Sequence, residues 1–143
     1  MIFGAYNEGS FEFCGVRYRQ WDDGTIEMDQ TEYLRRIEPI EIPKHRRADP
    51  KSDLTPVEVQ HLRRICGSLQ FAAVHTRPDL GAKVGHLQSM VTKGQAQHLL
   101  EANRVLYEGK KYPVCLMIVP IPEHQVTFCS FSDASFSGSK DLA

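Results

Sequence analysis

The sequence lacks the features of a membrane or secreted protein. No apolar run approaches the ~20 residues that span a bilayer. The first residues, MIFGAYNEGS, have neither the basic start nor the apolar segment of a signal peptide. The four cysteines are scattered, with no C-x-x-C pair, which is typical of reduced thiols rather than a disulfide framework. We therefore expect a soluble intracellular protein.

The sequence also has little net charge. Its 143 residues carry a formal net charge of −1. Hydrophobic residues make up 41% of the chain and charged residues 24%, a composition that indicates a globular domain rather than a disordered chain. The basic residues are nevertheless grouped, at positions 35–36, 44–47 and 63–64. A basic face can therefore exist without a basic protein, so net charge does not exclude nucleic acid as a partner.

Two strand patterns flank a turn near the N-terminus. Residues 11–18 are rich in aromatic and apolar side chains and predict one strand, while the alternation over 25–29 predicts another. Between them, W-D-D-G at 21–24 has two interpretations. Adjacent aspartates behind an aromatic are typical of a polymerase metal site, whereas Asp23-Gly24 would supply the positive-φ positions of a hairpin turn. The flanking strands favour the turn.

Helical signals follow. Residues 31–37 predict a short helical turn, and a charged linker with three prolines extends to about residue 52. Thr55, Pro56 and Glu58 then predict a capped helix that ends before Pro78. Further helices are expected over 78–91 and 95–107, with strands over 113–122 and 125–133. The order of hairpin, helices and strands predicts an α+β protein.

The helix beginning at residue 55 has two faces. Its core face comprises Val59, Leu62, Ile65, Cys66, Leu69, Ala72 and Ala73. The opposite face carries Gln60, Arg63, Gly67, Phe71 and Val74, with Arg64 beside them. A glycine in mid-helix costs ~1 kcal/mol relative to alanine and suits a close backbone approach. In one interpretation a neighbouring helix packs on Gly67 and Phe71 belongs to a second core layer. In the other a nucleic acid lies on this face, with Arg63 contacting phosphate and the Phe71 ring lying against a ribose.

Several phrases, taken in order, resemble copia-type retrotransposon Pol polyproteins. They are FEFCGVRY at 11–18, DDGTIEMDQTEYLRRI at 22–37, LTPVEVQHLRRICGSLQFAAVHTRPDL at 54–80, HLLEANRVLYEGKKY at 98–112 and FSDASFSG at 131–138. The G-S-L helix followed by T-R-P-D is quite specific, while each phrase alone is weak. The resemblance covers nearly the whole chain. It departs from the family pattern by apolar exchanges at Cys14, usually leucine, and Phe136, usually tryptophan.

The resemblance implies a fragment of a reverse transcriptase (an RNA-directed DNA polymerase) and ribonuclease H. Residues 1–40 would be the end of the palm with the primer-grip hairpin, 41–110 the thumb and connection helices, and 111–143 the start of a truncated ribonuclease H-like domain. The implied fold is α+β: a β-hairpin, a thumb-like bundle, then the first strands of an incomplete ribonuclease H-like domain. The polymerase aspartates and most ribonuclease H carboxylates are missing, so we expect primer–template binding without polymerisation.

Functional positions carry over from the family residue by residue. Phe13, Cys14 and Gly15 match the primer grip. The face with Gln60, Arg63, Arg64, Gly67 and Phe71 matches the minor-groove track, which favours the nucleic-acid interpretation. Asp133 matches the first metal-binding aspartate of ribonuclease H and would be catalytic only within a complete domain. The S-D-A-S context also fits a turn-initiating aspartate.

Cofactor and partners follow from the same resemblance. The parent enzyme uses Mg²⁺, and we expect no tight binding here because one aspartate cannot hold the ions that ribonuclease H chemistry needs. The expected partners are an RNA–DNA hybrid or primer–template and the missing palm and ribonuclease H portions of the polyprotein, with no membrane. The expected location is the cytoplasm, in a virus-like particle, or the nucleus.

Two other functions stay open. The first is a non-catalytic helical protein-interaction module derived from a decayed retroelement, whose binding would not weaken steeply with salt as phosphate binding does. The second is a nuclease acting through Asp133. A zinc site is not expected, because His61, His75 and His86 share no metal-ligand spacing with the cysteines and His98 lies on a helix whose orientation is open.

Overall fold

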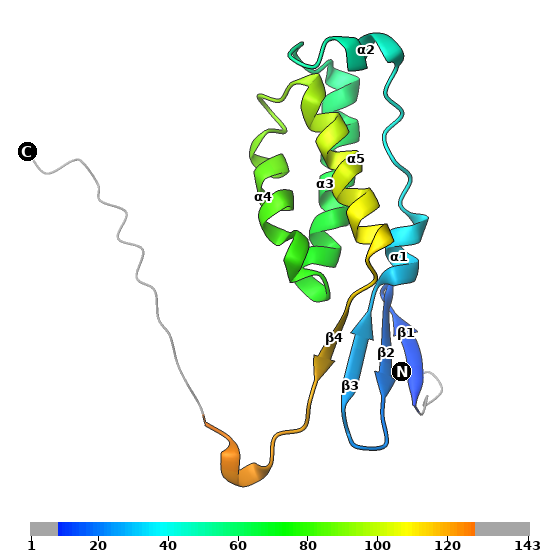
Figure 1. Ribbon diagram of the computed structural model, residues 1–143, viewed down its shortest axis with the longest axis vertical. Coiled ribbons are helices and arrows are strands. Elements are labelled where there is room, and N and C mark those ends of the chain that lie inside the picture. The colour runs from blue at the N-terminus through cyan, green and yellow to red at the C-terminus, as the bar shows by residue number, and fades with distance from the viewer. Residues whose placement is uncertain (1–8, 128–143) are drawn as a thin grey trace, which may run out of the picture.

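A computed structural model describes residues 9–127 as a bundle of helices with an antiparallel sheet at one end (Figure 1). The α+β class predicted from the sequence is confirmed. Asp133, and most of the strand expected over 125–133, lie outside the described residues. Within the described part, no helix combines the length and apolar content needed to cross a membrane.

The sheet has four strands in the order in which they occur in the chain. They are β1 (Ser10–Phe13), β2 (Val16–Gln20), β3 (Ile26–Asp29) and β4 (Cys115–Ile118), each antiparallel to its neighbour. The prediction of a single strand over 11–18 is wrong. The chain reverses at Cys14 and Gly15, whose φ angles of 50° and 76° are both positive. Two successive positive φ angles are what the common two-residue hairpin turn requires.

The second turn is the W-D-D-G segment. The main-chain N–H of Trp21 donates to the carbonyl of Thr25 at 2.9 Å, and the Asp23 carboxylate accepts from the Thr25 N–H at 2.9 Å. That backbone hydrogen bond lowers the pKa of Asp23. Within this turn only Gly24 has a positive φ angle, of 83°. The expectation that Asp23 also has a positive φ angle is wrong. The hairpin interpretation is confirmed, because the Asp23 carboxylate is used inside the turn.

Strand β4 joins the sheet from the far end of the described chain. It pairs with β3, with Ile26 opposite Ile118 and Asp29 opposite Cys115 (Figure 1). The strand expected over 113–122 therefore forms, shortened to four residues, and lies beside the N-terminal hairpins. All four of its side chains are exposed.

Five α-helices make up the bundle. They are α1 (Thr31–Arg36), α2 (Lys44–Ala48), α3 (Pro56–His75), α4 (Gly81–Ser89) and α5 (Ala96–Lys111), with 3-10 turns at Pro78–Leu80 and Glu123–Gln125. The capping box of Thr55 and Glu58 at the start of α3 is confirmed. Helix α2 lies inside the predicted linker, where five residues without an apolar stripe gave no periodic signal.

The core forms where α3 packs against α4 and α5. Six of the seven residues predicted for the core face of α3 are buried, and Val59 is partly buried against them. They meet Leu80, Val84, Leu87, Leu99, Ala102, Val105 and Leu106 from the following helices. Burying each large aliphatic side chain is worth roughly 1.5–3 kcal/mol, so this face positions the rest of α3.

The T-R-P-D segment at residues 76–79 connects several elements of the fold through hydrogen bonds. Arg77 is 1% exposed and donates to both carboxylate oxygens of Asp79, at 2.9 and 2.8 Å, and to the carbonyl of Gly109 at 2.8 Å. It therefore ties the end of α3 to the last turns of α5. Next to it, the Thr76 hydroxyl donates to the Gln30 side-chain oxygen at 2.8 Å, which joins the bundle to the end of β3.

Candidate nucleic-acid interface

The outward face of α3 is an open strip. Gln60, Arg63, Arg64, Gly67 and Val74 are exposed along it, and Phe71 is half-buried. A Cβ atom built on Gly67 would meet no neighbouring atom within 4 Å. The alternative in which a neighbouring helix packs against Gly67 is therefore wrong for residues 9–127, and the glycine leaves room for a partner outside this part of the chain.

The ring of Phe71 is held at the edge of this strip rather than inside a second core layer. It meets the ring of Tyr33 edge-on, with centroids 5.2 Å apart, and the ring of His75 at 4.4 Å. The ring stays partly exposed between these neighbours. A fixed aromatic ring with an accessible part is suited to contact a ribose or a base.

The residues matched to the primer grip lie together at the β1–β2 turn. Phe13 is 64% exposed and Cys14 is exposed, whereas Gly15 lies against α1. A Cβ atom on Gly15 would come 3.1 Å from Cδ2 of Tyr33. Positive φ at Cys14 is unusual for a residue with a side chain and stores local strain.

Tyr33 connects the turn to α3. Besides contacting Gly15 and Phe71, its hydroxyl donates to the carbonyl of Ser68 at 3.1 Å. Ser68 follows Gly67 directly, so one side chain fixes the distance between the β1–β2 turn and the open strip. No signal in the sequence distinguishes Tyr33, although it lies in the phrase DDGTIEMDQTEYLRRI at 22–37.

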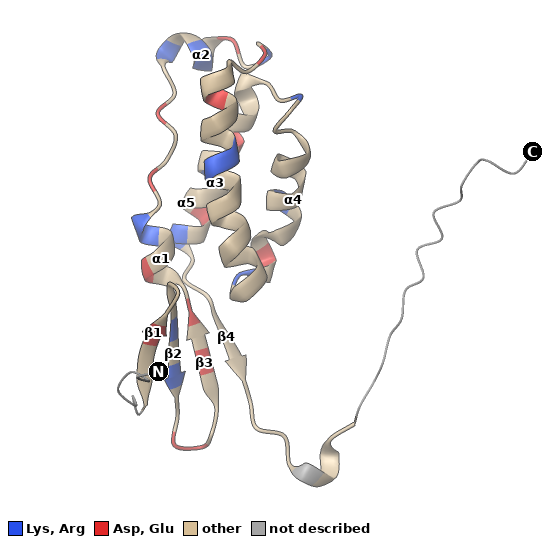
Figure 2. Cartoon of the chain, turned by 180° about the vertical axis from the view of Figure 1, so that it is seen from behind, with Lys and Arg blue, Asp and Glu red and all other residues tan. Residues whose placement is uncertain are grey.

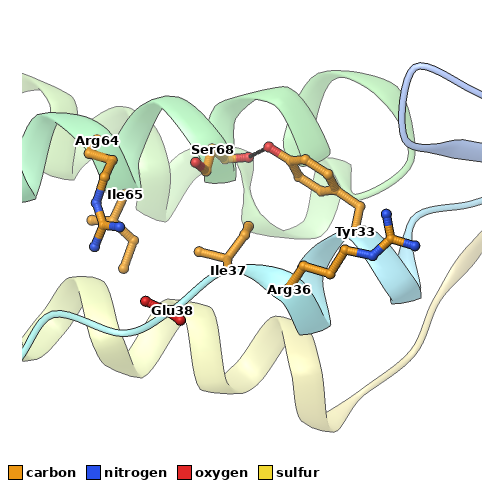
Figure 3. Close-up of a pocket in the computed structure, with 7 residues that line it drawn as sticks. All are labelled: Tyr33, Arg36, Ile37, Glu38, Arg64, Ile65 and Ser68. Carbon is orange, nitrogen blue, oxygen red and sulfur yellow. Dashed lines mark hydrogen bonds between the residues drawn. The ribbon is translucent and has the colours of Figure 1, made fainter.

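A pocket lies between α1 and α3 beside this connection. It is lined by Tyr33, Arg36, Ile37, Glu38, Arg64, Ile65 and Ser68 (Figure 3). Arg64 from α3 and Arg36 from α1 lie at opposite ends of the pocket, with the Tyr33–Ser68 hydrogen bond between them. The Glu38 carboxylate lines the same pocket, and Arg36 pairs with Glu12 at 3.8 Å. Arg64 is therefore the cation of this pocket that is available to an anion.

The arginines of the strip are available for a ligand. Basic residues lie on α1, α2, α3 and β2 (Figure 2), but several are used internally. Arg46, for example, donates to both carboxylate oxygens of Glu58 at 2.8 Å. Across residues 9–127, Arg63 and Arg64 have no ion-pair partner. Their charges can therefore neutralise phosphates without breaking a bridge.

The strip has a length suited to a short stretch of nucleic acid. From Gln60 to Phe71 the helix advances eleven residues, about 16 Å at ~1.5 Å per residue. One strand of a duplex advances ~3.4 Å per nucleotide, so the strip matches about five nucleotides.

Comparison with protein-family models, curated proteins and solved structures finds no match to this chain. Several of the sequence segments quoted above contact one another in the fold. Gln30 bonds to Thr76 of T-R-P-D, and Tyr33 bonds to Ser68 of the G-S-L helix. The phrases thus share one set of contacts. Of the predicted site residues, Gly15 of the turn and Phe71 of the strip both contact Tyr33 of α1, while Asp133 lies outside the described residues.

Proposed function

We propose that this chain binds an RNA–DNA hybrid or primer–template duplex as the thumb and primer-grip portion of a copia-type reverse transcriptase. The observation that carries this proposal is the open strip at Gly67, one turn from the unpaired Arg63 and one turn from the half-exposed Phe71. A structural glycine would be covered by a neighbour within the fold, and no described residue covers this one. The family phrases that meet around Tyr33 add support.

Each part of the strip has a separate task in this proposal. Arg63 and Arg64 neutralise phosphates, which supplies affinity without sequence preference. Gly67 lets the sugar edge approach the helix backbone, and Phe71 lies against a ribose. Tyr33 holds the β1–β2 turn, with Phe13 just before it, at a fixed distance from this track. The primer end would then meet the turn while the duplex follows α3.

Catalysis belongs to other parts of the proposed parent enzyme. The palm would supply the polymerase aspartates and ribonuclease H the remaining carboxylates for Mg²⁺, with Asp133 as one of them. The sheet exposes apolar side chains that a protein partner would cover, including Ile26, Leu116 and Ile118. A palm portion packed on this sheet is the partner that fits the resemblance.

The same exposed apolar side chains favour one other function, a protein-interaction module without a nucleic-acid role. Val119 and Ile121 continue the exposed apolar stretch beyond β4. A contiguous exposed apolar surface commonly marks a protein contact. In that case the partner binds the sheet, the α3 strip is unused, and salt has little effect on affinity.

The test is an anisotropy titration of a labelled RNA–DNA hybrid with the whole chain. The variant combines Arg63→Glu with Gly67→Leu, and the matched control is Arg104→Glu, an exposed arginine on α5. We expect the double variant to weaken binding at least tenfold and to lower the salt slope by about one per lost phosphate contact. Unchanged affinity in the double variant overturns the proposed track. No binding of the hybrid by the wild-type chain also overturns it and would favour the protein-interaction module.

A further inference from the structure

Three possible metal ligands converge where α4 packs against α5. His86 on α4 faces His98 and Glu101 on α5, and one ligand atom from each lies within 4.8 Å of the others. The two imidazole rings have centroids 6.3 Å apart. His98 and Glu101 are three residues apart on one helix and therefore share a face.

We propose that this cluster binds one divalent transition-metal ion, with Zn²⁺ as the best fit. Two imidazole nitrogens and one carboxylate oxygen form a donor set that zinc accepts with a fourth position left for water. Mg²⁺ and Ca²⁺ prefer oxygen ligands alone. His98 is buried, Glu101 half-buried and His86 exposed, so the site has a fixed base and an open entrance.

The distances require only a local adjustment. Zinc binds imidazole nitrogen at ~2.0–2.1 Å, so tetrahedral ligands lie about 3.4 Å from one another. Contraction from 4.8 Å falls mainly on the exposed His86, whose side chain has room to rotate. No metal-ligand spacing is visible in the sequence, because the three ligands come from two helices.

Main-chain contacts fix the ring of His98. Its Nδ1 atom lies 2.8 Å from the N–H of Gln95 and 3.2 Å from the carbonyl of Gln95. Without metal, Nδ1 accepts from the Gln95 N–H and the proton resides on Nε2. With metal on Nε2, the proton moves to Nδ1, which gives up the bond from the Gln95 N–H and donates instead to the Gln95 carbonyl, the usual outer contact of a metal-bound histidine. Metal binding therefore changes the tautomer of one identified ring.

The ion would tie α4 to the start of α5 across the loop of residues 90–95. That loop is already tight, because a Cβ atom on Gly94 would come 2.5 Å from the carbonyl oxygen of Met90. The first amides of α5 are also held, with Ala96 donating to Ser52 and Gln97 to Pro50, both at 2.9 Å. A metal at this corner stabilises the folded bundle, since it binds only where the two helices meet. The site is separate from the α3 strip and does not depend on the proposed nucleic-acid function.

The experiment is a calorimetric titration of Zn²⁺ into the full chain with a non-chelating reductant. Its variant is His86→Ala, which removes an exposed ligand without disturbing the core, and Glu101→Gln is the second. His61→Ala, an exposed histidine on α3, is the matched control. We expect one equivalent to bind, with affinity reduced at least tenfold in both ligand variants and unchanged in the control. No binding, or equal affinity in wild type and His86→Ala, overturns the proposal.

Two further measurements separate this site from adventitious metal binding. Replacing Cys14, Cys115 and Cys129 together by serine should leave the affinity unchanged, and loss of binding in that variant overturns the assignment. Nitrogen-15 spectra of the imidazole rings should show His98 changing from the Nε2–H to the Nδ1–H tautomer on addition of Zn²⁺. A His98 spectrum that stays the same at saturation also overturns it.

Discussion

The aromatic ring of Tyr33 lies against Gly15, where a Cβ atom would come 3.1 Å from Cδ2 of the ring. The hydroxyl of the same tyrosine donates to the carbonyl of Ser68. One side chain of α1 therefore contacts both the β1–β2 turn and α3. The relative position of the turn and the open strip is set by this tyrosine, so its contacts offer a direct test of how the two parts are coupled.

Gly15→Ala should destabilise the protein by about 1–2 kcal/mol. The φ of 76° disfavours any side chain, and the added methyl group would press on Tyr33. Chemical denaturation measures the change in unfolding free energy. Repeating the substitution in a Tyr33→Ala background removes the contact but keeps the backbone strain, so the cost of Gly15→Ala should fall. An equal cost in both backgrounds would show that the tyrosine contact carries no energy.

Arg77→Met should lower the unfolding free energy by about 2–3 kcal/mol, because it leaves the buried carbonyl of Gly109 without its donor and removes a charged hydrogen-bond network. Thermal and denaturant unfolding measure this loss. Asp79→Asn is the control, and its cost should be smaller since the Asp79 side chain is 46% exposed. Equal costs for the two variants would argue against Gly109 as the critical partner.

Helix α3 was predictable because its signals are local. Thr55, Pro56 and Glu58 specify the start of the helix, the apolar stripe specifies its buried face, and Pro78 limits its end. The W-D-D-G turn was predictable for the same reason. A few adjacent side chains and one glycine decide the backbone conformation there, whatever the rest of the chain does.

The misses have two physical origins, a turn without a local signal and contacts between segments far apart in the sequence. The turn at Cys14-Gly15 was hidden because a cysteine with positive φ has no propensity signal, and the surrounding residues alternate as one strand would. Tyr33 bridges segments far apart in sequence, and His86 meets His98 only when α4 and α5 pack. Gly67 is conspicuous in the sequence as a mid-helix glycine, but only its surroundings in the fold could decide between a packed helix and an open strip.

Glu58→Gln should destabilise the protein at neutral pH by about 1 kcal/mol. Burial raises the pKa of Glu58, but hydrogen bonds from Arg46 and Thr55 outweigh it, and the net pKa is lowered from 4.5. A lowered folded-state pKa adds stability above the unfolded value, and that stability is lost as pH falls through the folded value. The difference between wild type and variant should therefore shrink as pH falls below 4.5.

Denaturation curves across the acid range measure this difference. Glutamine keeps the size of the side chain and can still accept at the helix start, so the variant isolates the charge. Glu41→Gln is the control, because Glu41 is exposed and has no ion-pair partner in the part of the chain that the structure describes. A wild-type advantage that grows toward low pH would contradict the assigned role of the Arg46–Glu58 pair.

Cys66 should resist thiol reagents while Cys14 and Cys115 react. Burial raises the pKa of the Cys66 thiol to about 11, so at pH 8 only about one thiol in a thousand is ionised. Cys14 and Cys115 are exposed. Mass spectrometry that maps each labelled cysteine measures the rates, and denaturant should bring Cys66 to the rate of the other two. Cys66 directly precedes Gly67, so its labelling also reports local opening of α3 beneath the strip. Equal rates for Cys66 and Cys14 in native buffer would show that this part of α3 is not packed as described.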